Sequence, residues 1–229
     1  NVVEADDWAH LDEKLKPLAA ATAAVTAPET KAPAKSASLP ASCHPPKETD
    51  LARAQRREGQ WLAWLRGEAA IAKKDAGGAV AAADKIAAAT PKDDSFADMM
   101  RAAELTLRGR AAILRGNVLP GLKQIRQAAD LEDRETPSGP IESGVSARER
   151  LGEALLALRR PADALVELRR ALALHPRRAR VLLGCARAAG AAHDAAAAAG
   201  YWADLMRVWA HADADTPGLD EARHAVAAR

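Results

Sequence analysis

The stretch Arg148–Pro176, RERLGEALLALRRPADALVELRRALALHP, decides the fold. Leucines and alanines recur every three or four residues on both sides of Arg160-Pro161, which is the spacing of one face of an α-helix. Proline fits the first turn of a helix but interrupts a helix that has already begun. The pattern therefore predicts two amphipathic helices joined by a tight turn.

Small residues fall where these two helices would cross. Gly152 on the first helix leaves room for the second, while Ala164 and Ala171 on the second helix would lie at the crossing points. Pro176 ends the second helix. Helix hairpins can stack on neighbours only where side-chain bulk is missing, so the stretch predicts a hairpin that stacks on further hairpins.

The composition of the whole chain also favours helices. Of 229 residues, 48% are hydrophobic and 28% are charged, which is typical of a globular protein with a core. Aromatic residues make up only 3%, so alanine and leucine must supply most of the buried surface through close backbone approach. Ala, Leu, Arg and Glu are abundant, while residues that favour strands are sparse. We therefore predict an all-α fold of antiparallel helix hairpins stacked as an α-solenoid.

Weaker copies of the pattern lie on either side of Arg148–Pro176. They are marked by Gly67 with Ala79 and Pro91, by Gly109 with Ala128, and by Leu183-Gly184, which opens a copy that runs to Trp209. The four glycines, at positions 67, 109, 152 and 184, are 42, 43 and 32 residues apart. The loops between repeats are therefore expected to vary in length, and the superhelix to be irregular.

The central copy closely resembles the tetratricopeptide repeat, a helix hairpin of about 34 residues. The residues that carry the resemblance are Leu151, Gly152, Leu155, Ala164, Leu168, Ala171 and Pro176. The large aromatic residues usual in this repeat are mostly Leu or Ala here. The resemblance implies a non-catalytic scaffold that binds a protein or peptide in a concave groove lined by the first helix of each hairpin.

Residues 119–226 are also similar to the C-terminal half of a group of bacterial tetratricopeptide-repeat proteins that are often exported. The stretches QIRQAADLEDRETPSGPI, ARERLGEALLALRRPADAL and ADADTPGLDEAR carry this similarity. It implies a periplasmic or secreted protein, with a cytoplasmic location as the alternative. The first residue is Asn1, which fits either a cleaved leader or a trimmed N-terminus.

Three parts follow one another along the chain. They are residues 1–25, a predicted helix with Trp8, Leu11 and Leu15 on one face; residues 26–48, a Pro/Ala-rich linker with five prolines; and residues 49–229, the repeat domain. A capping helix is expected to start at Thr216-Pro217 and close the repeat domain. It should cover an apolar stripe formed by Tyr201, Trp202, Leu205, Met206 and Trp209.

The resemblance places a set of side chains in the groove, three to four residues apart on each first helix. They are Trp61, Trp64, Glu68 and Ile71; Thr106, Arg110 and Ile113; Glu149, Glu153 and Leu156; and Arg178 and Val181. Trp61 and Trp64 would anchor a ligand if they are exposed. The alternative is that Trp64 packs in the core against the N-terminal helix. Glu149 and Glu153 occupy places where recognition of a peptide carboxylate needs cations or amides, so no such recognition is predicted.

Charge and hydropathy argue against two classes of partner. The formal net charge is only +2, and acidic residues are interspersed among the arginine clusters, so a nucleic-acid partner is not expected. No run approaches the roughly 20 apolar residues that cross a bilayer, so no membrane span is expected.

Catalytic motifs are absent from the sequence. It contains no Gly-x-Ser-x-Gly, no Gly-x4-Gly-Lys and no His-Glu-x2-His, which predicts a protein that is not an enzyme and has no catalytic residues. Asp7-x2-His10 and Glu221-x2-His224 each offer only two ligands, so neither a metal nor a cofactor is predicted.

The histidines and cysteines leave two alternatives open. Six histidines and Cys43-His44 suggest, as the alternative function, an accessory subunit that handles a metal or cofactor for an enzyme complex. Cys43 and Cys185 are compatible with one disulfide in an oxidising compartment, and equally with two unrelated thiols.

Overall fold

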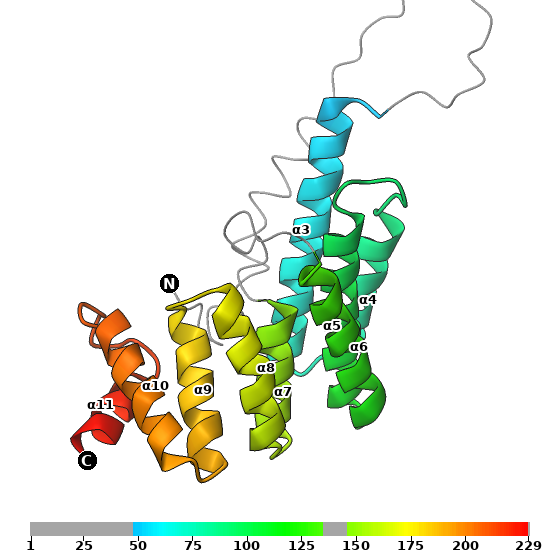
Figure 1. The fold of residues 1–229 in the computed structure, drawn as a ribbon. Helices are drawn as coiled ribbons and strands as arrows, with labels where there is room; N and C mark the ends of the chain where they lie inside the picture. The colour runs from blue at the N-terminus through cyan, green and yellow to red at the C-terminus, as the bar shows by residue number, and fades with distance from the viewer. Residues whose placement is uncertain (1–47, 135–145, 229) are drawn as a thin grey trace, which may run out of the picture.

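The computed structural model describes residues 48–134 and 146–228. These residues form α3 (Asp50–Ala72), α4 (Ala76–Ala88), α5 (Ala97–Leu114), α6 (Val118–Glu132), α7 (Ala147–Ala157), α8 (Pro161–Leu174), α9 (Ala179–Ala191), α10 (Ala195–Val208) and α11 (Leu219–Ala227), and no strands. Consecutive helices pack as antiparallel pairs, with α11 following the last pair (Figure 1). The prediction of an all-α, solenoid-like stack of hairpins is confirmed. The predicted helix 1–25 and all but the last residue of the linker 26–48 lie outside the described residues.

The four hairpin turns share one backbone geometry. Each contains one residue with positive φ: Lys74 at 58°, Gly116 at 84°, Arg159 at 57° and His193 at 62°. In each turn the next amide donates to the carbonyl five residues earlier, as Asp75 does to Ala70 at 2.8 Å and Arg160 to Leu155 at 2.9 Å. This is the Schellman motif, which satisfies the free carbonyls at a helix end. The hairpins are therefore structural copies, spaced by 42, 43 and 34 residues from turn to turn.

The shared turn corrects the register of the fourth copy. Gly67, Gly109 and Gly152 each lie seven residues before the positive-φ residue, but in the fourth hairpin that place belongs to Ala186 and not to Gly184. Ala186 is fully buried and small enough for a close helix crossing. Gly184 instead faces the preceding hairpin, since a Cβ there would lie 3.1 Å from Leu168 Cδ1. The prediction of Gly184 as the repeat glycine is wrong by two positions.

The small residues of the central hairpin lie between its two helices. A Cβ on Gly152 would come within 2.5 Å of Leu168 Cγ on α8. On the same second helix, Ala164 and Ala171 are 0% and 1% exposed. These three residues therefore form the close contact that the sequence predicts for the central hairpin.

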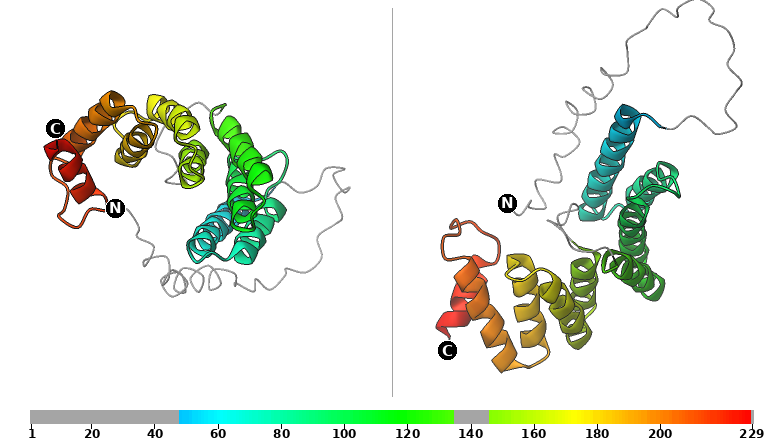
Figure 2. Two further views of the ribbon diagram at one scale, coloured as in Figure 1. Left: turned by 90° about the horizontal axis from the view of Figure 1, so that it is seen from below. Right: turned by 45° about the horizontal axis from the view of Figure 1, so that its top comes forward.

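The first helices of the hairpins form the inside of a curved array. α3, α5, α7 and α9 contact one another in succession, while each second helix packs on its own partner and on the first helix that follows. The hairpins follow an arc in the left view of Figure 2. We call the surface formed by α3, α5, α7 and α9 the inner face.

The capping helix begins later than its sequence predicts. α11 starts at Leu219, because Gly218 has a φ of 85°, which is incompatible with a first helical turn, and the Leu219 amide donates to the Thr216 carbonyl at 3.0 Å. α11 packs on α10, and Glu221 pairs with Arg187 of α9. The apolar stripe of α10 is mostly buried or half-buried in the core, but Tyr201 turns toward α8, where its hydroxyl accepts from Arg169 Nε at 2.8 Å.

A buried arginine holds together the two halves that flank residues 135–145. Arg148 on α7 is 3% exposed and pairs with Asp130 of α6, with Asp133 directly after α6, and with Glu167 of α8. Beside it, Glu132 accepts a hydrogen bond from the Ala147 amide at 2.6 Å. Leu122 and Ile125 of α6 also share one core with Leu151 and Leu155 of α7. The halves are thus packed as one array.

We expect Glu132 to make stability depend on pH. Burial raises its pKa from 4.5 to about 7, against the opposing effect of the Ala147 amide. The pKa of Glu132 in the folded state lies above its unfolded-state value. Its contribution to the free energy of unfolding is therefore fully present below pH ~4.5 and is lost as the pH rises through about 7. Relative to Glu132→Gln, the free energy of unfolding of the wild type should fall by at least about 1 kcal/mol between pH 5 and 8, by urea denaturation. A difference between the two proteins that stays constant over this range would contradict the assignment.

No helix within residues 48–134 and 146–228 combines the length and hydropathy that crossing a membrane requires.

Candidate functional site on the inner face

The inner face carries a glutamate that is shared by two arginines. Glu68 of α3 pairs with Arg110 of α5 through one carboxylate oxygen. Its other oxygen accepts a hydrogen bond from Arg150 Nη2 of α7 at 2.5 Å. One carboxylate therefore joins the first helices of three successive hairpins.

The pairing continues toward the C-terminal end of the array. Arg150 Nη1 donates to Glu153 at 3.1 Å, and Arg180 Nη2 of α9 lies 2.6 Å from the other oxygen of Glu153. Arg178, at the start of α9, pairs with Glu149. The result is a row of alternating charges across all four first helices, which we call the charge ladder: Arg110, Glu68, Arg150, Glu153, Arg180, Glu149 and Arg178.

Local sequence explains why α7 contributes three members of the ladder. Ser146 caps the helix, since its hydroxyl accepts from the Glu149 amide at 3.1 Å. The sequence Ser-x-x-Glu is that of a capping box, and an acidic residue in the first turn is favoured by the helix dipole. Glu153, one turn later, lies on the same side of α7 as Glu149. Arg150 reaches the ladder from the adjacent position because its side chain is long and flexible.

The side chains of the charge ladder differ in their exposure to solvent. Glu68 and Glu149 have side chains that are 5% and 1% exposed, so both carboxylates are withdrawn from solvent. Arg178, Arg180 and Glu153 are 27%, 35% and 37% exposed. A partner can therefore reach the ladder at Glu153, Arg178 and Arg180, which we call its open end, whereas Glu68 of α3 is buried.

Burial perturbs the titration of the ladder's interior. It raises the pKa of Glu149, and the neighbouring Arg178 opposes this effect. Burial also lowers the pKa of Arg110, and repulsion from Arg150 adds to the decrease. The charged forms of these buried side chains are therefore stabilised by pairing with one another. Removing one of them would leave its neighbours without a counter-charge.

Two residues placed in the groove by sequence lie elsewhere. Trp64 is 4% exposed and belongs to the core between α3, α4 and α5, and Thr106 is 1% exposed with its hydroxyl donating to the Ala102 carbonyl at 2.8 Å. Neither side chain can meet a ligand. Both occupy helix positions that turn toward neighbouring helices, so the prediction of Thr106 as a groove residue is wrong. For Trp64 the structure supports the alternative, a position in the core.

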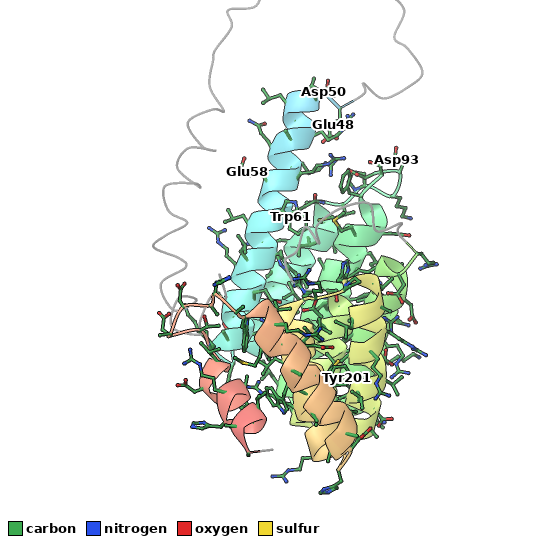
Figure 3. The ribbon with its side chains drawn as sticks, turned by 60° about the vertical axis from the view of Figure 1, so that its left-hand side comes forward. Glu48, Asp50, Glu58, Trp61, Asp93 and Tyr201 are labelled. Atoms are coloured by element: carbon green, nitrogen blue, oxygen red, sulfur yellow. The ribbon has the colours of Figure 1, made fainter. Side chains whose placement is uncertain are left out.

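The other groove predictions divide between the core and the surface. Trp61 on α3 is half-buried and packs against the same core as Trp64 (Figure 3). Ile71 and Val181 are buried, while Ile113 and Leu156 are half-buried. Glu68, Arg110, Glu149, Glu153 and Arg178 are the predicted residues that the fold brings together.

Sequence reasoning missed Arg150 and Arg180, which complete the ladder. Arg180 lies between Arg178 and Val181 and is not at helical spacing from either. Arg150 lies three residues before Glu153, but the predicted ridge took the neighbouring Glu149 in its place. The available signal was the mixed run Arg148-Glu149-Arg150, in which charges of opposite sign alternate along the chain.

Groups that would support other chemistry are scarce in the described part of the chain. No cluster of three or more His, Cys, Asp or Glu side chains there could hold a metal ion. Cys185 is a free, buried thiol, and burial raises its pKa to about 12, so it is a poor nucleophile. Cys43, His10 and His44 lie outside the described residues.

A separate hollow of about 570 Å³ lies among α8, α9 and α10. Leu172, Leu182 and Val208 form its apolar part, and Arg177 and Arg207 contribute charge. No member of the charge ladder lines it, so it is distinct from the inner face.

Comparison with known proteins finds no family model and no curated sequence that matches this chain.

Proposed function

We propose that this chain is a non-catalytic scaffold of the tetratricopeptide-repeat type that holds a protein or peptide partner on its inner face. The single observation that supports this most strongly is the charge ladder, which crosses four hairpins and opens to solvent at Arg178, Arg180 and Glu153. The partner's contact is proposed for α7 and α9, where these side chains are accessible.

The chemistry of the open end favours recognition by hydrogen bonds and charge. A guanidinium has five N–H donors, and Arg180 uses Nε and Nη2 on Glu153, so further donors remain for a partner's carboxylates or carbonyls. Glu153 fixes the position of Arg180 before a partner arrives. Preorganised side chains lose less conformational entropy on binding, which suits them to specific contact.

Arg180→Glu is expected to weaken partner binding about tenfold or more. Reversing this charge breaks the pairing with Glu153 and places like charges together, and such charge pairs at interfaces are worth about 1.5 kcal/mol or more. The measurement is co-purification of the full chain from its native source, followed by titration of the recovered partner. Arg223→Glu is the matched control, because Arg223 lies on α11, outside the charge ladder, and pairs with the exposed Asp220.

The scaffold proposal fails if native purification yields the chain alone. It also fails, for the inner face in particular, if Arg180→Glu and Arg223→Glu bind the recovered partner equally well.

We also propose a periplasmic or secreted location, with the cytoplasm as the alternative. The similarity of residues 119–226 to often exported bacterial repeat proteins supports this proposal. Fractionation of the native cells, followed by detection of the chain in the periplasmic, secreted and cytoplasmic fractions, tests it.

A further inference from the structure

We propose that the open end of the charge ladder binds residues 1–25 of this same chain. This inference rests on the proposed role of the inner face as a binding surface and names an occupant for it. Three features support it: complementary charge, complementary apolar residues, and a linker of sufficient length.

The charges of the two surfaces are complementary. The first 13 residues contain five carboxylates and no lysine or arginine; the carboxylates are Glu4, Asp6, Asp7, Asp12 and Glu13. At the start of α9 and along it, Arg178, Arg180 and Arg187 have partly exposed side chains, and each is paired with one glutamate of the fold. Carboxylates and guanidinium groups form strong, often bidentate hydrogen bonds. An acidic segment is therefore the expected occupant of this part of the inner face.

Apolar side chains beside the arginines match the remaining residues of the segment. Leu156 follows Glu153 by three residues on α7, and Leu183 follows Arg180 by three residues on α9, and both are half-buried. Residues 1–25 are predicted to carry Trp8, Leu11 and Leu15 on one face. An amphipathic helix with acidic flanks would place these side chains against the two leucines and its carboxylates against the arginines.

The linker is long enough for this contact. The chain enters the described structure near the tip of α3, where Asp50 projects beyond the rest of the array (Figure 3). α3 has 23 residues and is about 35 Å long at 1.5 Å per residue. An extended proline-rich chain covers about 3.1 Å per residue, so a stretch as long as residues 26–48 can reach up to about 70 Å. The linker can therefore return along the length of α3 to the inner face.

Limited trypsin digestion of the full chain tests this contact with an internal control. Lys14 lies in the proposed occupant, whereas Lys31 and Lys35 lie in the linker, and Lys16 precedes Pro17 and is not cleaved. At low ionic strength, cleavage after Lys14 should be about tenfold or more slower than after Lys31, because an isolated helix of this length is marginal in water and gives little protection by itself. Equal rates at the two sites overturn the inference.

Variants of the full chain identify the surface that protects Lys14. The double variant Arg180→Glu with Arg187→Glu should raise the rate of trypsin cleavage after Lys14 to the rate after Lys31. Adding Asp6→Arg and Asp7→Arg to it should slow cleavage after Lys14 again, at least in part. Leu51→Glu is the matched control, because Leu51 is 60% exposed on the projecting part of α3. If Leu51→Glu releases Lys14 and the arginine reversals do not, the segment binds α3 and the inference is wrong.

Two further measurements guard against an unfolded variant. The helical circular dichroism of each variant should match the wild type, and amide hydrogen exchange of residues 8–15 should accelerate in the arginine variant while that of α5 does not.

Protection of Lys14 from trypsin should also fall at 1 M salt, where charge interactions are screened beyond about 3 Å. Protection that persists at high salt in a folded arginine variant overturns the inference.

These experiments use no partner, so they separate this inference from the proposed function. If Lys14 is unprotected but a partner binds through Arg180, the intramolecular contact is refuted and the scaffold remains. If Lys14 is protected through α9 but no partner is recovered, the contact is supported and the scaffold proposal is refuted.

Discussion

Glu68→Gln is expected to destabilise the protein by about 3 kcal/mol or more, because it leaves two arginines of the ladder's interior without their shared carboxylate. Arg110 and Arg150 both pair with Glu68, and their mutual repulsion already contributes to the lowered pKa of Arg110. Breaking a buried pair by removing one partner typically costs about 3 to 5 kcal/mol. Urea denaturation followed by circular dichroism measures the change in the free energy of unfolding.

A compensating variant distinguishes lost charge from lost packing. Glu68→Met combined with Arg110→Met removes both charges of one pair, fills a similar volume, and leaves Arg150 paired with Glu153. This double variant should recover most of the lost stability, since apolar replacement of a buried pair is often neutral. Asp220→Asn is the exposed control and should change stability by less than about 0.5 kcal/mol. A double variant as unstable as Glu68→Gln would refute the charge explanation.

Sequence patterns predicted the hairpins well because local physics determines them. Leucine and alanine periodicity places the helices, and Pro161 opens α8 at the position that the sequence indicates. The turns were harder to align, because the shared left-handed residue is glycine in one hairpin and Lys74, Arg159 or His193 in the others. Long polar side chains seldom adopt this conformation, so the sequence gives no signal for it at these positions. For this reason the fourth copy was placed out of register.

The binding face was only partly predictable, because its key contacts join residues far apart in sequence. Helical spacing on α7 correctly placed Glu149 and Glu153 on one side of the helix. The contact of Arg150 with Glu68, however, joins residues 82 positions apart and depends on how the hairpins stack. Helical spacing also fails to distinguish a side chain that faces the groove from one that faces a neighbouring helix. Thr106 was assigned to the groove for this reason, and Trp64 was placed there with a core position as the alternative, whereas the fold buries both.

Gly109→Ala is expected to destabilise the protein by about 2 kcal/mol, although alanine is the better helix former. At this crossing, α5 and α6 approach so closely that a Cβ on Gly109 would lie 2.7 Å from the Gly121 carbonyl oxygen and 3.1 Å from the Ile125 amide nitrogen. These atoms belong to the backbone, so no change of side-chain rotamer can relieve the overlap. The two helices must separate, which loosens the packing between them. Urea denaturation again provides the measurement.

Two other glycines supply matched controls for this substitution. Gly59→Ala lies on an exposed part of α3 with no atom within 4 Å of the added Cβ, so it should stabilise the protein by about 0.5 to 1 kcal/mol. The three atoms nearest to a Cβ on Gly152 all belong to the side chain of Leu168, which can yield more readily than the backbone, so the cost of Gly152→Ala should fall between the other two. This ranking follows from whether backbone, side chain or solvent occupies the space beside each glycine. If Gly109→Ala were as stable as Gly59→Ala, close helix crossing at the repeat glycines could not be what shapes the array.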